Sequence, residues 1–89
     1  MRAVITVVGK DMVGILAKVS TICAENDVNI IEVTQSILQD MFCMIMMADV
    51  SDCKMPFAEF SDKLSALGEN NGLQIHVMNE DIFNSMHRI

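Results

Sequence analysis

The sequence lacks tryptophan and tyrosine, and its 89 residues include one proline and four glycines. It has no apolar run near the roughly 18 residues of a membrane-spanning helix, and its N-terminus lacks the cleavage pattern of a signal peptide. We therefore expect a cytoplasmic protein. Hydrophobic residues make up 52% of the chain, which argues against disorder. A chain of this length forms one domain that buries roughly 60% of its unfolded-chain surface.

Basic residues are scarce. There are six against twelve acidic residues, which leaves a formal net charge of −6. The basic residues are dispersed and form no cluster: Arg2, Lys10, Lys18, Lys54, Lys63 and Arg88. This charge argues against a nucleic acid or an anionic membrane as partner, because both are bound through positive patches.

Cysteine and histidine are few as well. Cys23, Cys43 and Cys53 form an odd set with no close pair, which fits reduced thiols better than a disulfide framework or a zinc site. His76 and His87 have neither a carboxylate partner nor ligand spacing around them. We therefore expect no catalytic residue, no metal and no cofactor.

Strand patterns are the clearest positive signal in the chain. Apolar and β-branched runs predict four strands, at 3–8, 28–38, 41–50 and 73–78. The first and third are apolar on both faces, whereas the second and fourth alternate. In the second strand, Ile31, Val33 and Ile37 point one way and polar side chains the other. Strands that are apolar on both faces belong in the middle of a sheet and alternating strands at its edges.

Helical spacing of apolar residues predicts a helix over 12–26, ended by Asn26 and Asp27. A second helix has Pro56 in its first turn and Gly72 as its C-cap. A short terminal helix follows, with a cap and acidic first turn at 79–81 and three apolar side chains beyond: Ile82, Phe83 and Met86.

The predicted fold follows from this order of elements. Right-handed crossovers and a tight hairpin at 39–40 arrange the strands as 4-1-3-2. The fold class is therefore α+β: a ferredoxin-like βαββαβ sandwich with an antiparallel sheet, two helices on one face and a short C-terminal helix. The opposite face needs a cover, either the terminal segment with Phe83 and Met86 or a second subunit. The second strand is a long exposed edge, so we expect a homodimer through this edge.

Function in this fold must come from its sites. RNA recognition needs aromatic side chains on the central strands, where only Phe42 is found. A soft-metal carrier needs paired cysteines in the first loop, and an acylphosphatase-like enzyme needs a phosphate-binding arginine and asparagine. The first loop contains neither set and offers only Lys10.

The first loop leaves two interpretations open. Asp11 can act as N-cap of the first helix, and Gly14 allows a second backbone or a small ligand to approach its N-terminus, which favours an anion. The stretch from Gly9 to Ile15 is then either an ordinary strand-to-helix turn or the floor of a carboxylate-binding site.

A resemblance to a known family bears on this choice. The run from Val4 to Val8, the stretch Gly9-Lys10-Asp11-Met12-Val13-Gly14-Ile15-Leu16-Ala17 and the strand opening Val28-Asn29-Ile30-Ile31 together resemble an ACT domain. The likeness covers residues 1–78, and 79–89 would be a C-terminal helical tail. The compact length and the ending at 82–89 resemble small stand-alone ACT-domain proteins of bacteria and archaea.

The resemblance implies a regulatory module without catalytic residues that binds an amino acid between two chains paired side by side. Asp11, Met12, Val13, Gly14 and Ile15 would line one side of that site, with backbone N–H groups holding the ligand carboxylate, and Asn29 and Ile30 would line the other. Because no enzyme or DNA-binding domain is fused to the predicted module, regulation would act through a separate protein. The alternative is a structural dimerisation or protein-interaction domain without a ligand, whose partner binds the methionine-rich open face.

Overall fold

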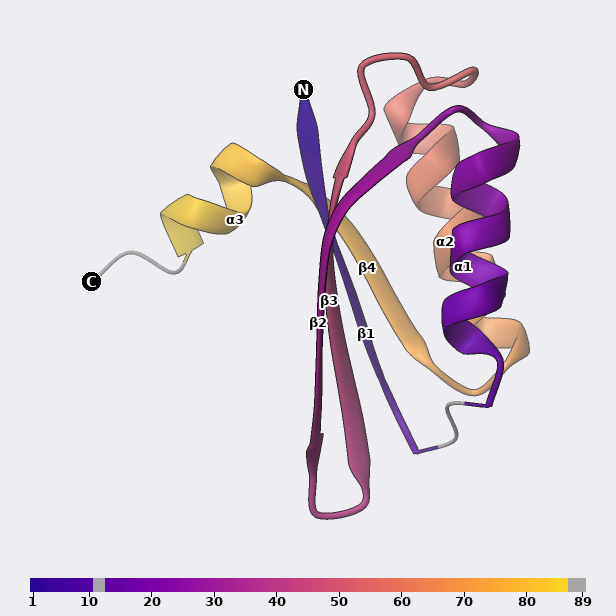
Figure 1. Cartoon of the computed structure of the whole chain (residues 1–89), viewed down its shortest axis with the longest axis vertical. Helices are drawn as coiled ribbons and strands as arrows, with labels where there is room; N and C mark the ends of the chain where they lie inside the picture. The colour runs from indigo at the N-terminus through magenta and orange to yellow at the C-terminus, as the bar shows by residue number, and fades with distance from the viewer. Residues whose placement is uncertain (11–12, 87–89) are drawn as a thin grey trace.

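The computed structural model describes residues 1–10 and 13–86. Along the chain it contains β1 (Arg2–Gly9), α1 (Ile15–Glu25), β2 (Asn29–Leu38), β3 (Met41–Asp49), α2 (Phe57–Asn70), β4 (Gln74–Asn79) and α3 (Glu80–Met86). The strands form an antiparallel sheet in the order β2-β3-β1-β4. This confirms the predicted βαββαβ fold and the predicted strand order. Helices α1 and α2 lie on one face of the sheet and α3 on the other (Figure 1).

The core lies between the sheet and the helix layer formed by α1 and α2 (Figure 1). Its sheet side comes from alternate residues of the two central strands, which are 0% exposed: Ala3, Ile5, Val7, Met44, Met46 and Ala48. The helices contribute the fully buried Val19 from α1 and Phe60 and Leu64 from α2. Strands β1 and β3 therefore lie in the middle of the sheet, as their two apolar faces predicted.

The helices begin later than predicted. Helix α1 starts at Ile15 rather than residue 12, because Gly14 has a φ of 74°, which no right-handed helix accommodates. Gly14 therefore holds the N-cap position that we predicted for Asp11, and Asp11 itself lies outside the described residues. Pro56 likewise sits at the N-cap of α2 rather than in its first turn, because its ψ of 149° is extended.

Both helices end in the same hydrogen-bonded motif. Val28 N donates to Cys23 O at 2.8 Å after α1, and Leu73 N donates to Gly68 O at 2.8 Å after α2. The residue that makes each turn has a positive φ, 57° at Asp27 and 69° at Gly72. This is the Schellman arrangement, and it confirms that these two residues end the helices.

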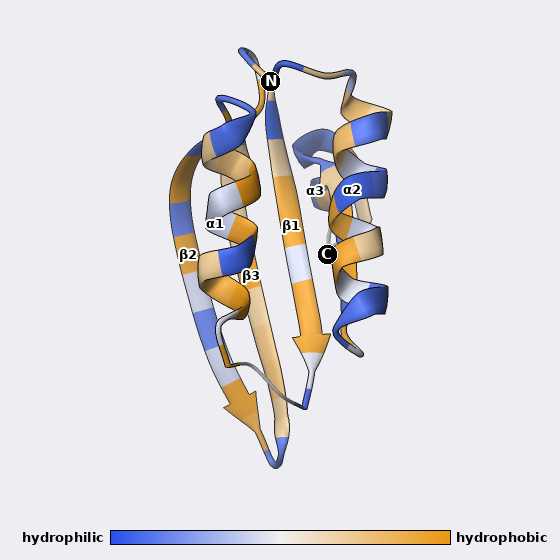
Figure 2. Ribbon diagram, turned by 90° about the vertical axis from the view of Figure 1, so that its right-hand side faces the viewer, coloured by the Kyte–Doolittle hydropathy of each residue, from blue (hydrophilic) through white to orange (hydrophobic). Residues whose placement is uncertain are grey.

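Strand β2 differs from its predicted pattern in two ways. The pairing with β3 shifts between Ile30 and Glu32, so a bulge at Ile31 makes Ile30 the residue that packs against the core. Beyond the bulge, Val33 and Ile37 face the helix side but are 37% and 73% exposed. These two apolar side chains therefore stay partly uncovered within one chain, and the end of the β2–β3 hairpin, to which Ile37 belongs, extends beyond the N-terminal end of α1 (Figure 2).

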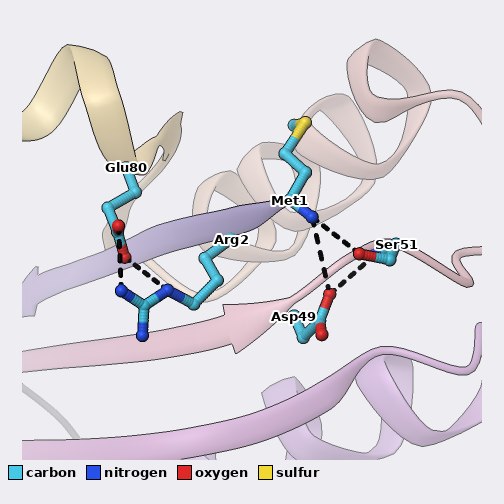
Figure 3. A network of polar contacts seen from close by, with 5 residues as sticks. All are labelled: Met1, Arg2, Asp49, Ser51 and Glu80. Carbon is cyan, nitrogen blue, oxygen red and sulfur yellow. Dashed lines mark hydrogen bonds and ion pairs between the residues drawn. The ribbon is translucent and has the colours of Figure 1, made fainter.

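Helix α3 covers part of the open face, which is the face of the sheet opposite α1 and α2. Asp81 N donates to Asn79 Oδ1 at 2.7 Å, so Asn79 caps the helix as predicted. Glu80 forms a two-point ion pair with Arg2 of β1: Arg2 Nε lies 2.7 Å from Oε2 and Nη2 2.9 Å from Oε1 (Figure 3). On this face Val4 is 1% exposed, whereas Ile45 is 44% exposed. The terminal segment thus covers one end of the face only.

Candidate functional site

The first loop connects β1 to α1 and contains most of the predicted ligand contacts. Asp11 and Met12 lie outside the described residues. Val13 is 91% exposed, whereas Ile15 is 3% exposed and packs into the core, so Ile15 offers only its backbone to a ligand. Gly14 is exposed, and a Cβ built on it meets no atom of residues 1–10 and 13–86 within 4 Å. Within this part of the chain, no side chain therefore blocks the approach to Gly14.

Electrostatics at the first turn of α1 favour an anion. The first intrahelical bond runs from Lys18 N to Gly14 O at 3.0 Å, so the preceding N–H groups of the helix have no carbonyl acceptor within it. Gly14 has no side chain to cap them. N–H groups that lack an intrahelical acceptor, together with the helix dipole, make a helix terminus attractive to a carboxylate.

The second predicted half of the site is the start of β2. Asn29 is exposed and pairs opposite Asp49 of β3, and Ile30 is half-buried against the core. Beside Asn29 lies a surface hollow of about 570 Å³, and its lining consists of Ala24, Asp27, Val28, Asn29 and Asp52. We did not predict the carboxylates of Asp27 and Asp52 as part of a site. The sequence predicts Asp27 at a helix end and Asp52 in a loop, and the two are far apart in the chain. Only the folded structure places both in the lining of one hollow.

The two halves lie at opposite ends of α1. Gly14 immediately precedes the helix and Asn29 follows it, and an eleven-residue helix is about 16 Å long. In Figure 1 α1 begins at the lower end of the helix layer, and the chain enters β2 at the upper end. One chain therefore does not bring the predicted site residues together.

Two ionisable groups elsewhere, Cys23 and Asp49, have shifted pKa values. Burial, with a smaller contribution from neighbouring Cys53, raises the pKa of the Cys23 thiol to about 11, so this thiol stays protonated at neutral pH. Asp49 accepts a hydrogen bond from Ser51 N at 2.9 Å, and hydrogen bonds from Ser51 lower the pKa of this carboxyl (Figure 3). Among residues 1–10 and 13–86, no three His, Cys, Asp or Glu side chains are grouped as metal ligands.

Comparison with known proteins places this fold in a family. The sequence model of the ACT domain matches residues 2–78. The chain belongs to the ACT domain family. A UPF0237 protein of Methanocaldococcus jannaschii is 44% identical over 88 residues, which cover 99% of this chain and 98% of that protein. An ACT domain protein from Streptococcus pneumoniae superimposes with a TM-score of 0.81 at 37% identity over 93% of each chain.

The same ACT fold also occurs inside larger proteins. A formyltetrahydrofolate deformylase from Pseudomonas syringae superimposes with a TM-score of 0.76 at 21% identity, over 88% of this chain but only 27% of the enzyme. At that identity the likeness concerns the fold alone. ACT domains are regulatory modules that typically bind small molecules and dimerise. In the described part of this ACT chain, no helix is long and apolar enough to cross a membrane.

Proposed function

We propose that the chain is a cytoplasmic, regulatory amino-acid-binding module that works as a side-by-side homodimer and has no catalytic residues of its own. The observation that carries the proposal is the separation of the two halves of the candidate site. The first loop and the start of β2 each have suitable chemistry, but one chain keeps them a helix length apart. A second copy provides the missing half.

The edge of β2 supplies the contact between copies. The strand has ten residues, and all of them are exposed except the half-buried Ile30. Its outer edge has no neighbouring strand in the sheet. A long exposed edge of this kind pairs readily with its own copy across a two-fold axis. Pairing would also cover the apolar side chains of Val33 and Ile37, which are exposed in one chain.

Symmetry then brings the half-sites together. A two-fold axis perpendicular to the sheet, at the middle of β2, makes the two β2 strands antiparallel and keeps all four sheet-covering helices on one face. It also reverses α1 in the second copy. The first turn of α1 in one copy therefore lies beside the start of β2 in the other. Gly14 of one chain then faces the same space as Asn29 of the second chain.

The chemistry of this joint site matches a zwitterion. The first turn of α1 attracts a carboxylate. The hollow beside Asn29 contains the carboxylates of Asp52 and of Asp27, and Asp27 also lies 3.7 Å from Lys54 Nζ. Both carboxylates attract an ammonium group, and the Asn29 amide can donate or accept a hydrogen bond. A free amino acid carries both charged groups on one carbon, so an amino acid is the ligand class that we propose.

A thermal-shift screen of the dimer against the common amino acids tests the proposal. We expect one of them to raise the Tm by about 6–11 °C at roughly ten times its Kd. Asn29→Ala should remove this rise. Asn70→Ala, at the exposed end of α2, is the matched control and should retain it. No shift with any amino acid at millimolar concentration would contradict the proposal, as would an equal loss in both variants.

The open face favours a second candidate function, that of a protein-interaction domain without a ligand. Ile45 is 44% exposed there, beside the half-buried Cys43 and Met47. Phe83→Asp would place a charge on α3 next to this face. If this function holds, the substitution should abolish partner capture while leaving the dimer intact, and no amino acid should shift the Tm.

A further inference from the structure

A second hollow lies on the open face, at the end of the sheet where β1 meets the first loop. Its volume is about 460 Å³, and its lining consists of Val8, Gly9, Lys10, Met41, Gly72 and Gln74. Val8 and Gln74 face each other across the β1–β4 pair. Val8 lies on the face opposite its buried neighbour Val7, so this hollow and the core are on different sides of the sheet. It is also separated from the β2 edge by β3.

The walls of this hollow are apolar. Val8 and Met41 are both half-buried and supply hydrocarbon and thioether surface. Gly72 contributes backbone alone, and its positive φ of 69° is the conformation that ends α2. A volume of this size falls within the range of about 300–1,000 Å³ that small-molecule sites occupy. The hollow therefore has room for a small ligand with an apolar body.

Lys10 gives the hollow a charge that the rest of the fold does not use. Three other cations are already engaged: Arg2 with Glu80, Lys18 with Asn71 Oδ1 at 2.8 Å, and Lys54 with Asp27. Lys10 has no ion pair with the residues that the structure describes. In a chain of net charge −6, this cation stands at the rim of an apolar hollow. Gln74 adds an amide that can donate a hydrogen bond next to it.

We propose that this hollow binds a small apolar carboxylate, with its hydrocarbon against Val8 and Met41 and its carboxylate on Lys10 and Gln74. This site is separate from the proposed amino-acid site in its face, its residues and its ligand class. The six described lining residues include no carboxylate, so the ammonium group of an amino acid would approach Lys10 with no anionic acceptor among them. This lining therefore favours simple carboxylates over zwitterions.

A titration followed by ¹H–¹⁵N NMR tests the proposal with three probes of one shape: hexanoate, hexanamide and hexylammonium. Hexanoate should shift the backbone amides of residues 8–10 and 72–74. Hexanamide should bind more weakly at the same residues because it lacks the charge, and hexylammonium should not bind there. Shifts centred on the first turn of α1 would overturn the proposal, as would equal affinity for hexanoate and hexanamide or no shift at millimolar hexanoate.

Matched variants separate Lys10 from general charge effects. Lys10→Met keeps the length of the side chain and should weaken hexanoate binding about fivefold, which corresponds to the loss of a partly exposed ion pair. Lys63→Met makes the same change on the exposed surface of α2 and should leave the affinity unchanged. Met41→Glu places a like charge against the ligand and should abolish binding. Equal behaviour of Lys10→Met and Lys63→Met would refute the role of Lys10.

Discussion

At the scale of single residues, close contacts decide which glycines the fold requires. Gly14 turns the chain into α1 with a positive φ, and a Cβ added there meets none of the described atoms within 4 Å. Gly68 is different. It lies in α2 with ordinary helical φ, but a Cβ there would be 2.9 Å from Leu73 O and 3.2 Å from Ile75 N. Both of these atoms belong to the backbone leading into β4, which cannot move without disturbing the sheet.

Gly68→Ala tests this close approach. In an exposed helix interior the change would stabilise by about 1 kcal/mol through helix propensity. Here we expect a loss of about 1–3 kcal/mol in the free energy of unfolding, because the added methyl group pushes α2 away from β4. Urea denaturation measures the change. Ala66→Gly, at an exposed position of the same helix, calibrates the propensity alone, and a stabilised Gly68→Ala would contradict the packing.

The buried thiol of Cys23 supports a second test at this scale. It is 1% exposed, and its pKa is raised from 9.0 to about 11, so it carries little thiolate at pH 8. Cys43 and Cys53 are half-buried. We expect a thiol reagent at pH 8 to label Cys43 and Cys53 first and Cys23 only after denaturation, as read by mass spectrometry of the peptides. Early labelling of Cys23 would show that the C-terminal half of α1 opens readily.

The raised pKa of Cys23 also predicts that the free energy of unfolding decreases at alkaline pH. The unfolded thiol ionises near 9 and the folded thiol near 11, so its contribution to stability is complete below pH 9 and is lost as the pH rises towards 11. Asp49 behaves in the opposite sense. Its folded pKa lies below the usual 3.8, so its contribution is present above that pH and is lost in stronger acid.

At the scale of elements, α3 depends on tertiary contacts. Seven residues are too few for an isolated helix to be stable in water. Ile82 and Met86 are 56% and 65% exposed, so these apolar side chains of α3 bury only part of their surface against the sheet. The contacts that hold α3 in place include its packing on β1 and β4, the Asn79 cap and the ion pair between Arg2 and Glu80.

Arg2→Met should therefore loosen α3 without unfolding the domain. We expect faster amide hydrogen exchange over residues 81–86, and a change of no more than about 1 kcal/mol in global stability, because the Arg2 side chain is 49% exposed. Lys63→Met serves as the control for the loss of one positive charge. Unchanged exchange in α3 would mean that packing alone fixes the helix.

At the scale of the whole molecule, the proposed dimer makes the binding site a shared property of two chains. A two-fold axis through the middle of β2 places each central residue of the strand beside its own copy. Thr34 is exposed and lies near that middle, where it pairs with Ile45 of β3. A charge introduced there would meet an identical charge across the axis.

Thr34→Lys should accordingly give a monomer, because two like charges oppose each other directly across paired strands. Thr34→Glu should do the same, and an equimolar mixture of the two variants should restore a dimer through opposite charges. Sedimentation velocity reports the three states, and Thr21→Lys on the exposed side of α1 should remain dimeric. The thermal shift by an amino acid should vanish in the monomers and return in the mixture. A monomer that keeps the shift would place the site within one chain.

The pattern of apolar residues along the sequence was sufficient to predict the order of the strands in the sheet. Runs that are apolar on both faces identified β1 and β3 as central strands, and positive φ at Asp27 and Gly72 ended the helices as their residue types predict. These features depend on neighbours within a few residues, and so they can be read locally. The predicted site residues Val13, Gly14, Asn29 and Ile30 are all accessible or half-buried, but whether they bind a ligand stays a prediction.

What only the tertiary structure decided concerns residues that are distant in the sequence. The start of α1 depended on the φ of Gly14, and the exposure of Ile37 on how far the β2–β3 hairpin extends beyond the N-terminal end of α1. The hollow with Lys10 and Met41 and the grouping of Asp27 with Asp52 arise from segments that meet only in the folded chain. Local patterns determine which face of an element is apolar, whereas the length of each element and its packing determine what that face finally meets.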